Sequence, residues 1–130
     1  MEELLAHLVG DYVVQSDWMA TKKTSHAFPA LCHAASYTAI FALVFGLRWE
    51  ALAVIGTTHF VIDRWRLARF VIRAKNWLLA PPSARPADVN WVTGYPNDTP
   101  PWMATWLFII VDNTLHLWFN HAALVWWFPN

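Results

Sequence analysis

Four long apolar segments divide the chain, and the polar residues within them recur at helical spacing. Between residues 3 and 21 the polar positions His7, Asp11 and Gln15 follow one another at intervals of four. Four residues make slightly more than one helical turn, so these side chains lie on one face of a helix. Apolar runs of about twenty residues are typical of membrane-spanning helices. The pattern therefore predicts helices at about 3–21, 27–47, 50–79 and 101–128.

The third segment changes character along its length. It is apolar as far as Ile62 and then becomes basic, with no proline or glycine to end the helix before residue 79. This continuity predicts a long third helix whose basic end extends along the membrane surface. Proline, asparagine, aspartate and glycine dominate residues 81–101, which predicts an irregular loop before the last helix. We expect a single all-α domain over residues 1–130, folded as a four-helix integral membrane bundle.

Composition and charge support a membrane location. The chain is 57% hydrophobic and contains ten tryptophans, and its mean hydropathy is +0.30. Tryptophan favours the membrane–water interface because its ring is amphipathic. If the amino terminus lies outside, all of the nine lysines and arginines except Arg48 fall on the inner side. The positive-inside rule favours that orientation, which places both termini outside.

The polar positions in these segments include three histidine–aspartate pairs at a spacing of four. Ionisable groups within lipid-facing helices are costly and usually functional. Imidazole nitrogen and carboxylate oxygen both bind divalent transition metals such as zinc or manganese. Together with His33, the pairs give seven candidate ligands for one ion or for two, namely His7, Asp11, His33, His59, Asp63, Asp112 and His116. Gln15 extends the first polar stripe and is a candidate to support the ligands.

A metal at this position would favour hydrolysis of a phosphoester, with a lipid-linked phosphate as the expected substrate. A bound metal activates water and polarises a phosphoryl group. Asp11, Asp63 and Asp112 are candidates both as ligands and as the general base. The candidates for binding a phosphate or lipid head group are Lys22, Lys23, Arg64 and Arg66. His26 and His121 are not expected to be ligands.

Other interpretations of the same residues remain open. Any single pair is also explained by an ion pair or by a hydrogen-bonded core histidine. The set as a whole is compatible with a proton or cation pathway, which in four short helices would require a homo-oligomer. A third interpretation is a polar centre without chemistry, in a phage or host membrane factor that binds a partner. A soluble or peripheral bundle is a fourth. The zero net charge gives no reason to expect nucleic acid as a partner, whereas membrane lipids are expected.

Specific motifs resemble those of a known family. They are the block HLVGDYVVQSDWMA from His7 to Ala20, then His33, His59-Phe-Val-Ile-Asp63 and Asp112-Asn-Thr-Leu-His116. This arrangement resembles the bacterial and phage membrane proteins grouped as domain of unknown function 3307, and it covers nearly the whole chain. The resemblance implies a multi-pass protein of the bacterial inner (cytoplasmic) membrane and supplies no settled activity. The chain is more weakly similar to membrane-bound metal-dependent hydrolases, although it lacks their His-Arg-Gly-x-Thr-His block.

Overall fold

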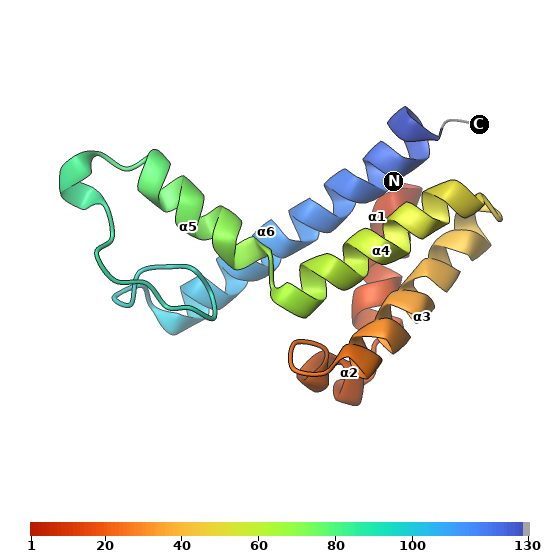
Figure 1. Cartoon of the computed structure of the whole chain (residues 1–130), viewed down its shortest axis with the longest axis horizontal. Coiled ribbons are helices and arrows are strands. Elements are labelled where there is room, and N and C mark those ends of the chain that lie inside the picture. The colour runs from red at the N-terminus through yellow and green to blue at the C-terminus, as the bar shows by residue number, and fades with distance from the viewer. Residues whose placement is uncertain (129–130) are drawn as a thin grey trace. The chain divides into compact units, whose positions relative to one another are not determined.

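The computed structural model describes residues 1–128, and its regular elements are helices (Figure 1). Within this part of the chain there is no strand, and Val89 and Pro96 form only an isolated antiparallel bridge. The predicted all-α class is therefore confirmed. The chain divides into two compact units. The first holds Met1–Trp65 together with the chain from His116 onward, and the second holds Arg66–Leu115.

The first predicted helix is three shorter elements. Helix α1 (Glu2–Leu8) continues into a π-helical turn, η1 (Val9–Val14), and the backbone of Gln15 is then extended. The side chain of Ser16 accepts a hydrogen bond from the Met19 amide and so caps the short helix α2 (Asp17–Lys22). Serine is favoured at such positions because its oxygen satisfies a free amide of the first turn. The prediction of one helix over residues 3–21 is therefore wrong near Gln15.

Helices α3 (Ala27–Phe45) and α4 (Trp49–Trp65) form the centre of the first unit. They are joined through Gly46, whose φ of 80° suits glycine. Helix α3 also packs against α1, η1 and α2, as Figure 1 shows. The contact with η1 depends on Gly10, because a Cβ there would lie 2.5 Å from Cδ2 of Tyr37. Only glycine allows this approach without movement of the Tyr37 ring.

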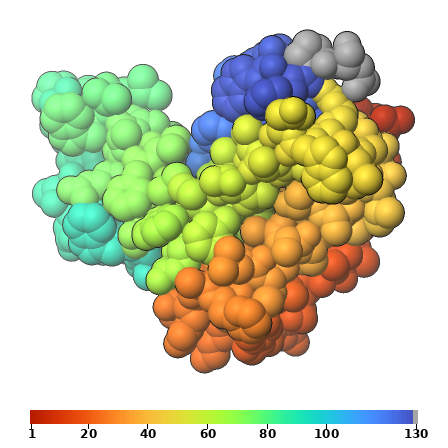
Figure 2. Space-filling model, turned by 45° about the vertical axis from the view of Figure 1, so that its right-hand side comes forward, coloured from red at the N-terminus to blue at the C-terminus, as the bar shows by residue number. Residues whose placement is uncertain are grey.

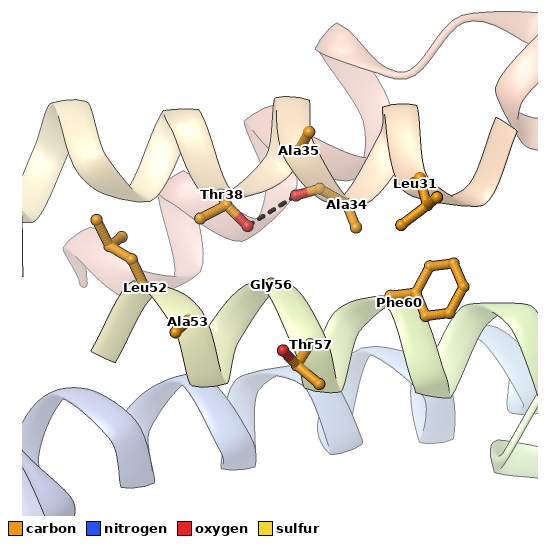
Figure 3. Close-up of a pocket in the computed structure, with 9 residues that line it drawn as sticks. All are labelled: Leu31, Ala34, Ala35, Thr38, Leu52, Ala53, Gly56, Thr57 and Phe60. Carbon is orange, nitrogen blue, oxygen red and sulfur yellow. Dashed lines mark hydrogen bonds between the residues drawn. The ribbon is translucent and has the colours of Figure 1, made fainter. Parts of the chain in front are cut away.

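Helix α4 packs against α3 on one side and against the last helical turns of the chain on another. Those turns are η3 (Ala122–Trp127), which continues helix α6 (Pro101–His121). The buried apolar cluster of this unit consists of Ala6, Tyr37, Phe41, Ala51, Leu52, Ile55, Ala123 and Leu124. On their outer side, α3 and α4 leave an open groove of about 450 Å³ lined by small and apolar residues (Figure 3).

The prediction of one continuous helix over residues 50–79 is also wrong. Helix α4 ends at Trp65 and a separate helix, α5 (Ala68–Leu78), follows. Arg66 has a φ of 50°, which lies in the left-handed region and cannot continue a right-handed helix. Tertiary contacts stabilise this conformation, since Arg66 Nε donates to the carbonyl of Val92 and the guanidinium lies 4.5 Å from the Phe108 ring centre.

The second unit contains α5, the first part of α6 and the segment between them. Its buried cluster is Ala68, Ile72, Tyr95, Ala104 and Phe108. The segment between the helices is irregular, as predicted, apart from a short 3-10 helix, η2 (Pro82–Ala84). Gly94 has a φ of 79° and packs against the Arg69 backbone, where a Cβ would collide with the carbonyl oxygen. A glycine is required there for both reasons.

Among the described helices, α3 alone has the length and apolar composition needed to cross a membrane. It is 19 residues long, with a mean hydropathy of 1.6 over its most apolar stretch. The outer face of the first unit is drawn in Figure 2, where α3 is orange and the start of α4 is yellow. Large apolar side chains are exposed on α3, including Phe28, Leu31 and Leu43.

Candidate metal centre

Five of the predicted ligands meet in the interior of the first unit. Asp11 comes from η1, His33 from α3, His59 and Asp63 from α4, and His116 from α6. The three histidines are almost completely buried, and the Asp63 side chain is 5% exposed. Burial of so many ionisable groups is unfavourable unless they satisfy one another or bind an ion. They form two groups of three ligands that share His59.

The first group is Asp11, His33 and His59. The Nε2 atoms of His33 and His59 are 2.9 Å apart, and Asp11 Oδ1 lies 3.4 Å from the first and 3.5 Å from the second. Ligands of a tetrahedral zinc ion with bonds of about 2.0–2.1 Å lie about 3.3 Å from one another. The two distances to Asp11 Oδ1 match that spacing, whereas the two imidazole nitrogens are closer, at hydrogen-bonding distance. Three is also the number of ligands that catalytic zinc sites draw from the protein.

The second group is His59, Asp63 and His116. Asp63 Oδ2 lies 3.1 Å from His59 Nε2 and 3.2 Å from His33 Nε2, and its other oxygen lies 3.7 Å from His116 Nε2. One carboxylate thus contacts imidazoles from three helices. Its position beside the first group suits either a ligand of a second ion or a base next to the first ion.

Two polar side chains border the ligands on the side of α2. Lys23 Nζ donates to Asp63 Oδ2 at 2.9 Å, and its side chain is 17% exposed. In the amide orientation that satisfies its neighbours, Gln15 lies 2.9 Å from Lys23 Nζ and 3.1 Å from His33 Nε2. Gln15 therefore lies beside two residues of the candidate centre, and its supporting role stays a prediction. The centre is least buried here, since Asp11 is 10% exposed as well.

A second polar layer lies behind the imidazoles. The Tyr37 hydroxyl accepts a hydrogen bond from Asn120 Nδ2 at 2.7 Å and is 2.9 Å from His7 Nδ1. The Tyr37 ring stacks on His59 with the ring centres 3.7 Å apart and the planes 19° from parallel. His7 also lies 3.6 Å from Asp11 Oδ2. His7 is thus beside the ligands rather than in either group of three.

The two central imidazoles make polar contacts through Nε2 and ring contacts with their neighbours. Within residues 1–128, the buried Nδ1 atoms of His33 and His59 have no hydrogen-bond partner. Metal-binding histidines usually donate from this second nitrogen to a carboxylate or carbonyl. Here the His59 ring contacts Tyr37 by stacking and His116 with the ring centres 4.2 Å apart. These ring contacts come from the neighbouring helices α3 and α6.

The four predicted phosphate-binding residues have different surroundings. Lys23 donates a hydrogen bond to Asp63, and Lys22 is exposed in the last turn of α2. The Arg64 guanidinium donates to the carbonyls of Thr24 and Ser25 and so fixes the loop between α2 and α3. Arg66 belongs to the second unit. Of the four, Lys23 is the residue whose contact with the centre is established, and Lys22 is the next residue along the chain.

Some predicted ligands are not in the two groups, and other residues of the centre were not predicted. Asp112 is half-buried on α6 in the second unit. His121 Nδ1 lies 3.1 Å from Glu3 Oε2, and His26 Nδ1 is 2.8 Å from Ser25 Oγ. Tyr37 and Asn120 were missed, although each follows a ligand, His33 or His116, by four residues. The same helical spacing that marked the pairs could have identified them.

Comparison with known proteins assigns the chain to a family. The family model described as Protein of unknown function (DUF3307) matches residues 1–127. The chain belongs to this family. No curated protein and no solved structure matches the chain. The matched range contains all residues of the candidate metal centre, whereas the family description assigns no activity. The function must therefore be inferred from the chemistry of the centre.

Proposed function

We propose that this DUF3307 protein is an integral membrane metalloenzyme that hydrolyses a phosphoester, with a lipid-linked phosphate as its substrate. The observation that carries the proposal is the group formed by Asp11 Oδ1, His33 Nε2 and His59 Nε2, with mutual distances of 2.9–3.5 Å in a buried site. Zinc or manganese suits this ligand set. Three protein ligands leave a coordination position for water.

The surface of the first unit supports a membrane location. Val13, Phe28 and Leu43 are 76%, 68% and 82% exposed, while the ionisable groups are inside. A lipid environment favours a large apolar surface around a polar interior, because exposure of the same apolar side chains to water would be unfavourable. At 1.5 Å per residue, α3 rises about 28 Å, close to the thickness of a bilayer core. We infer that α1, α3, α4 and α6 together form the membrane bundle.

The ends of the first unit differ in charge, which supports one orientation. Lys22, Lys23 and Arg64 lie at the end where Lys23 meets Asp63 and where Arg64 clamps the loop before α3. At the other end, Arg48 donates to the carbonyl of Leu124. The positive-inside rule then favours a bacterial inner-membrane protein with the lysine-rich end in the cytoplasm and both termini outside.

The residues around the first group have clear roles in such a hydrolysis. The metal would lower the pKa of a bound water and polarise the phosphoryl group. Asp63 contacts both histidine ligands and is the best-placed base to take the proton of the attacking water. Lys23 holds that carboxylate, and Lys22 is placed to attract a phosphate. In an alternative arrangement, Asp63 and His116 would hold the ion with His59, and Asp63 would then be a ligand and not the base.

The first experiment measures metal content by mass spectrometry in detergent-purified protein. Wild type is expected to contain one or two equivalents of zinc or manganese, and His59→Ala to contain less than one tenth of that, because His59 belongs to both groups. His26→Ala is the matched control, since His26 is exposed outside the centre. Metal-free wild type that is folded and does not take up added ions would exclude the metalloenzyme.

A second experiment tests the substrate. Metal-loaded protein in nanodiscs is offered lipid-linked phosphomonoesters and phosphodiesters, and released phosphate or alcohol is measured. Asp63→Asn is expected to lower kcat at least about a hundredfold, as loss of a general base does. Lys22→Gln is expected to raise KM with a smaller effect on kcat, because it removes only an attraction for phosphate. A metal-replete protein with no turnover of either substrate class would refute hydrolysis while leaving the metal site intact.

One observation favours a second candidate, proton or cation transfer. The polar contacts continue beyond the ligands, from Lys23 and Asp63 through the imidazoles to Tyr37, His7 and Asn120. Buried polar chains of this kind carry protons in membrane transporters. Metal-independent ion flux in liposomes, lost in His59→Ala and accompanied by a stable homo-oligomer, would support this candidate over hydrolysis.

A further inference from the structure

Helix α5 presents three distinct rows of side chains. Ala68 and Ile72 are fully buried against the cluster of Tyr95, Ala104 and Phe108. A second row is apolar and exposed: Phe70, Val71, Trp77 and Leu78 are 46%, 42%, 52% and 65% exposed. A third row is basic and consists of Arg69 and Arg73, together with Arg66, which precedes the helix and has a left-handed backbone. Ala68 and Ile72, like Arg69 and Arg73, are four residues apart, and the apolar row repeats after seven residues, from 70 to 77 and from 71 to 78, as expected for stripes along a helix.

The exposed apolar row is not explained by the fold of the second unit. That unit already has its buried face in the Ala68 and Ile72 row, and an ordinary soluble helix would place polar residues on the remaining surface. Instead, four large apolar side chains of α5 are open to solvent in the structure. Such a row requires a partner that accepts apolar side chains.

The basic row binds a neighbouring exposed segment that is itself apolar. Arg69 Nη1 donates to the carbonyl of Trp91, and Arg66 Nε donates to the carbonyl of Val92, both at 3.2 Å. The Arg73 guanidinium lies 4.5 Å from the Trp91 ring centre. Trp91 and Val92 are 59% and 58% exposed. The arginines therefore lie between two apolar groups, the exposed row of α5 and the pair Trp91 and Val92. We call these two groups and the three arginines together the α5 surface.

The charge of the α5 surface selects the partner. Residues 66–79 contain Arg66, Arg69, Arg73 and Lys75 and no acidic residue. Interfacial helices combine an apolar face with lysine or arginine beside it, so that the apolar side chains enter the lipid while the cations meet the head groups. Tryptophan at the boundary adds to this preference. An anionic leaflet supplies both the apolar interior and the negative charge that the α5 surface lacks.

We propose that α5 binds the surface of an anionic lipid leaflet, with Phe70, Val71, Trp77 and Leu78 in the acyl region and the arginine row at the phosphates. The proposal concerns only the second unit and does not depend on a metal or on hydrolysis. The lipid head group is recognised by charge, so any anionic glycerophospholipid serves as a probe.

The test uses the full chain in nanodiscs that contain phosphatidylcholine with or without phosphatidylglycerol. In a Cys32→Ser background, an environment-sensitive fluorophore is attached to Leu78→Cys in the apolar row or to Ser83→Cys, an exposed control position outside it. With anionic lipid, the label at 78 is expected to emit at shorter wavelength and to be quenched by a neutral aqueous quencher about threefold less than the label at 83. Equal quenching at the two positions would overturn the proposal.

The arginines are tested separately from the apolar row. The double variant Arg69→Gln/Arg73→Gln is expected to abolish the difference in fluorophore quenching at position 78 between anionic and zwitterionic nanodiscs. Lys75→Gln is the matched control, because Lys75 is on the same helix but lies over the Tyr95 ring at 5.4 Å, and it is expected to keep most of that difference. If the label at position 78 of the protein with its arginines intact is protected from the quencher equally in both lipids, and if salt does not change this protection, the role of charge is overturned.

A measurement on the unmodified protein guards against labelled variants that fail to fold. Amide hydrogen exchange of Ala68–Leu78 is compared in the two kinds of nanodisc, with Ala27–Phe45 as the internal reference. Slower exchange of α5 in anionic nanodiscs, with no change in α3, is expected. Identical exchange of α5 in both lipids would contradict the proposal independently of any substitution.

Discussion

Each buried imidazole of the metal centre has a neighbour of complementary chemistry. His33 and His59 face two carboxylates, and the carboxylate of Asp63 is also bonded to Lys23. A single ionised group in this interior would be very unfavourable, whereas mutual pairing reduces the cost. Replacing one partner therefore leaves an uncompensated group. The buried polar residues therefore depend on one another. The effect of a substitution depends on which polar group it leaves without a partner.

Tyr37→Phe tests the layer behind the ligands. The variant keeps the ring that stacks on His59 and removes only the hydroxyl that accepts from Asn120. Because the Asn120 amide is then buried without that acceptor, we expect a loss of about 1–3 kcal/mol in the free energy of unfolding. Metal content is expected to be unchanged, because the ring still supports His59.

The measurement is thermal unfolding in detergent, with metal content determined on the same samples. Tyr12→Phe is the control, since Tyr12 is 55% exposed and removal of its hydroxyl should change stability by less than about 0.5 kcal/mol. If the two variants are equally stable, the Tyr37 hydroxyl does not hold the buried layer together.

Between helices, small residues determine how closely α3 and α4 approach. In the groove of Figure 3, Gly56 of α4 faces Thr38 of α3, whose hydroxyl donates to the carbonyl of Ala34. A Cβ on Gly56 would lie 2.7 Å from Thr38 Oγ1. Since α3 and α4 together carry three of the five central ligands, their separation also determines the spacing of the metal centre.

Gly56→Ala is therefore expected to have opposite effects in two backgrounds. In wild type the clash with Thr38 should exceed the helix propensity gained from alanine, which is about 1 kcal/mol, and the variant should be less stable. In a Thr38→Ala background the obstructing oxygen is absent, so Gly56→Ala should be neutral or stabilising. A double-mutant cycle of unfolding free energies measures this. The same effect in both backgrounds would show that Thr38 does not limit helix approach.

At the scale of the whole molecule, the candidate metal ligands belong to only one of the two units. All residues of both ligand groups belong to the unit that contains α3 and α4, and none belongs to Arg66–Leu115. A ligand that binds the folded state alone stabilises it in proportion to the logarithm of its concentration over Kd. Removal of the ion should therefore weaken the first unit selectively.

Chelation of the purified protein is expected to lower Tm, with a stability loss of about 2.7 kcal/mol if the ion had been present at one hundred times its Kd. Hydrogen exchange should become faster in Ala27–Phe45 and Trp49–Trp65 and should stay unchanged in Ala68–Leu78. His59→Ala, which lacks a shared ligand, should show no response to the chelator. A chelator response of equal size in that variant would place the bound ion elsewhere.

Local patterns account for the predictions that succeeded. The helical class follows from the apolar segments. Polar positions at a spacing of four selected Asp11, His59, Asp63 and His116 as candidate ligands, and metal binding by them stays a prediction. The break at Arg66 could not be predicted in this way, because no glycine or proline marks it. Its left-handed backbone is compensated by contacts with Val92 and Phe108, which are distant in sequence.

The sequence by itself determined which residues could bind a metal and that they lie on helices, because side-chain type and helical periodicity are local properties. Only the tertiary structure decided which of the seven candidates meet. It brings Asp11, His33, His59, Asp63 and His116 into two groups, places His7 with Tyr37 and Asn120 behind them, and leaves Asp112 in the other unit. Distances between helices depend on packing contacts such as Gly10 against Tyr37, and such contacts join residues that no local pattern relates.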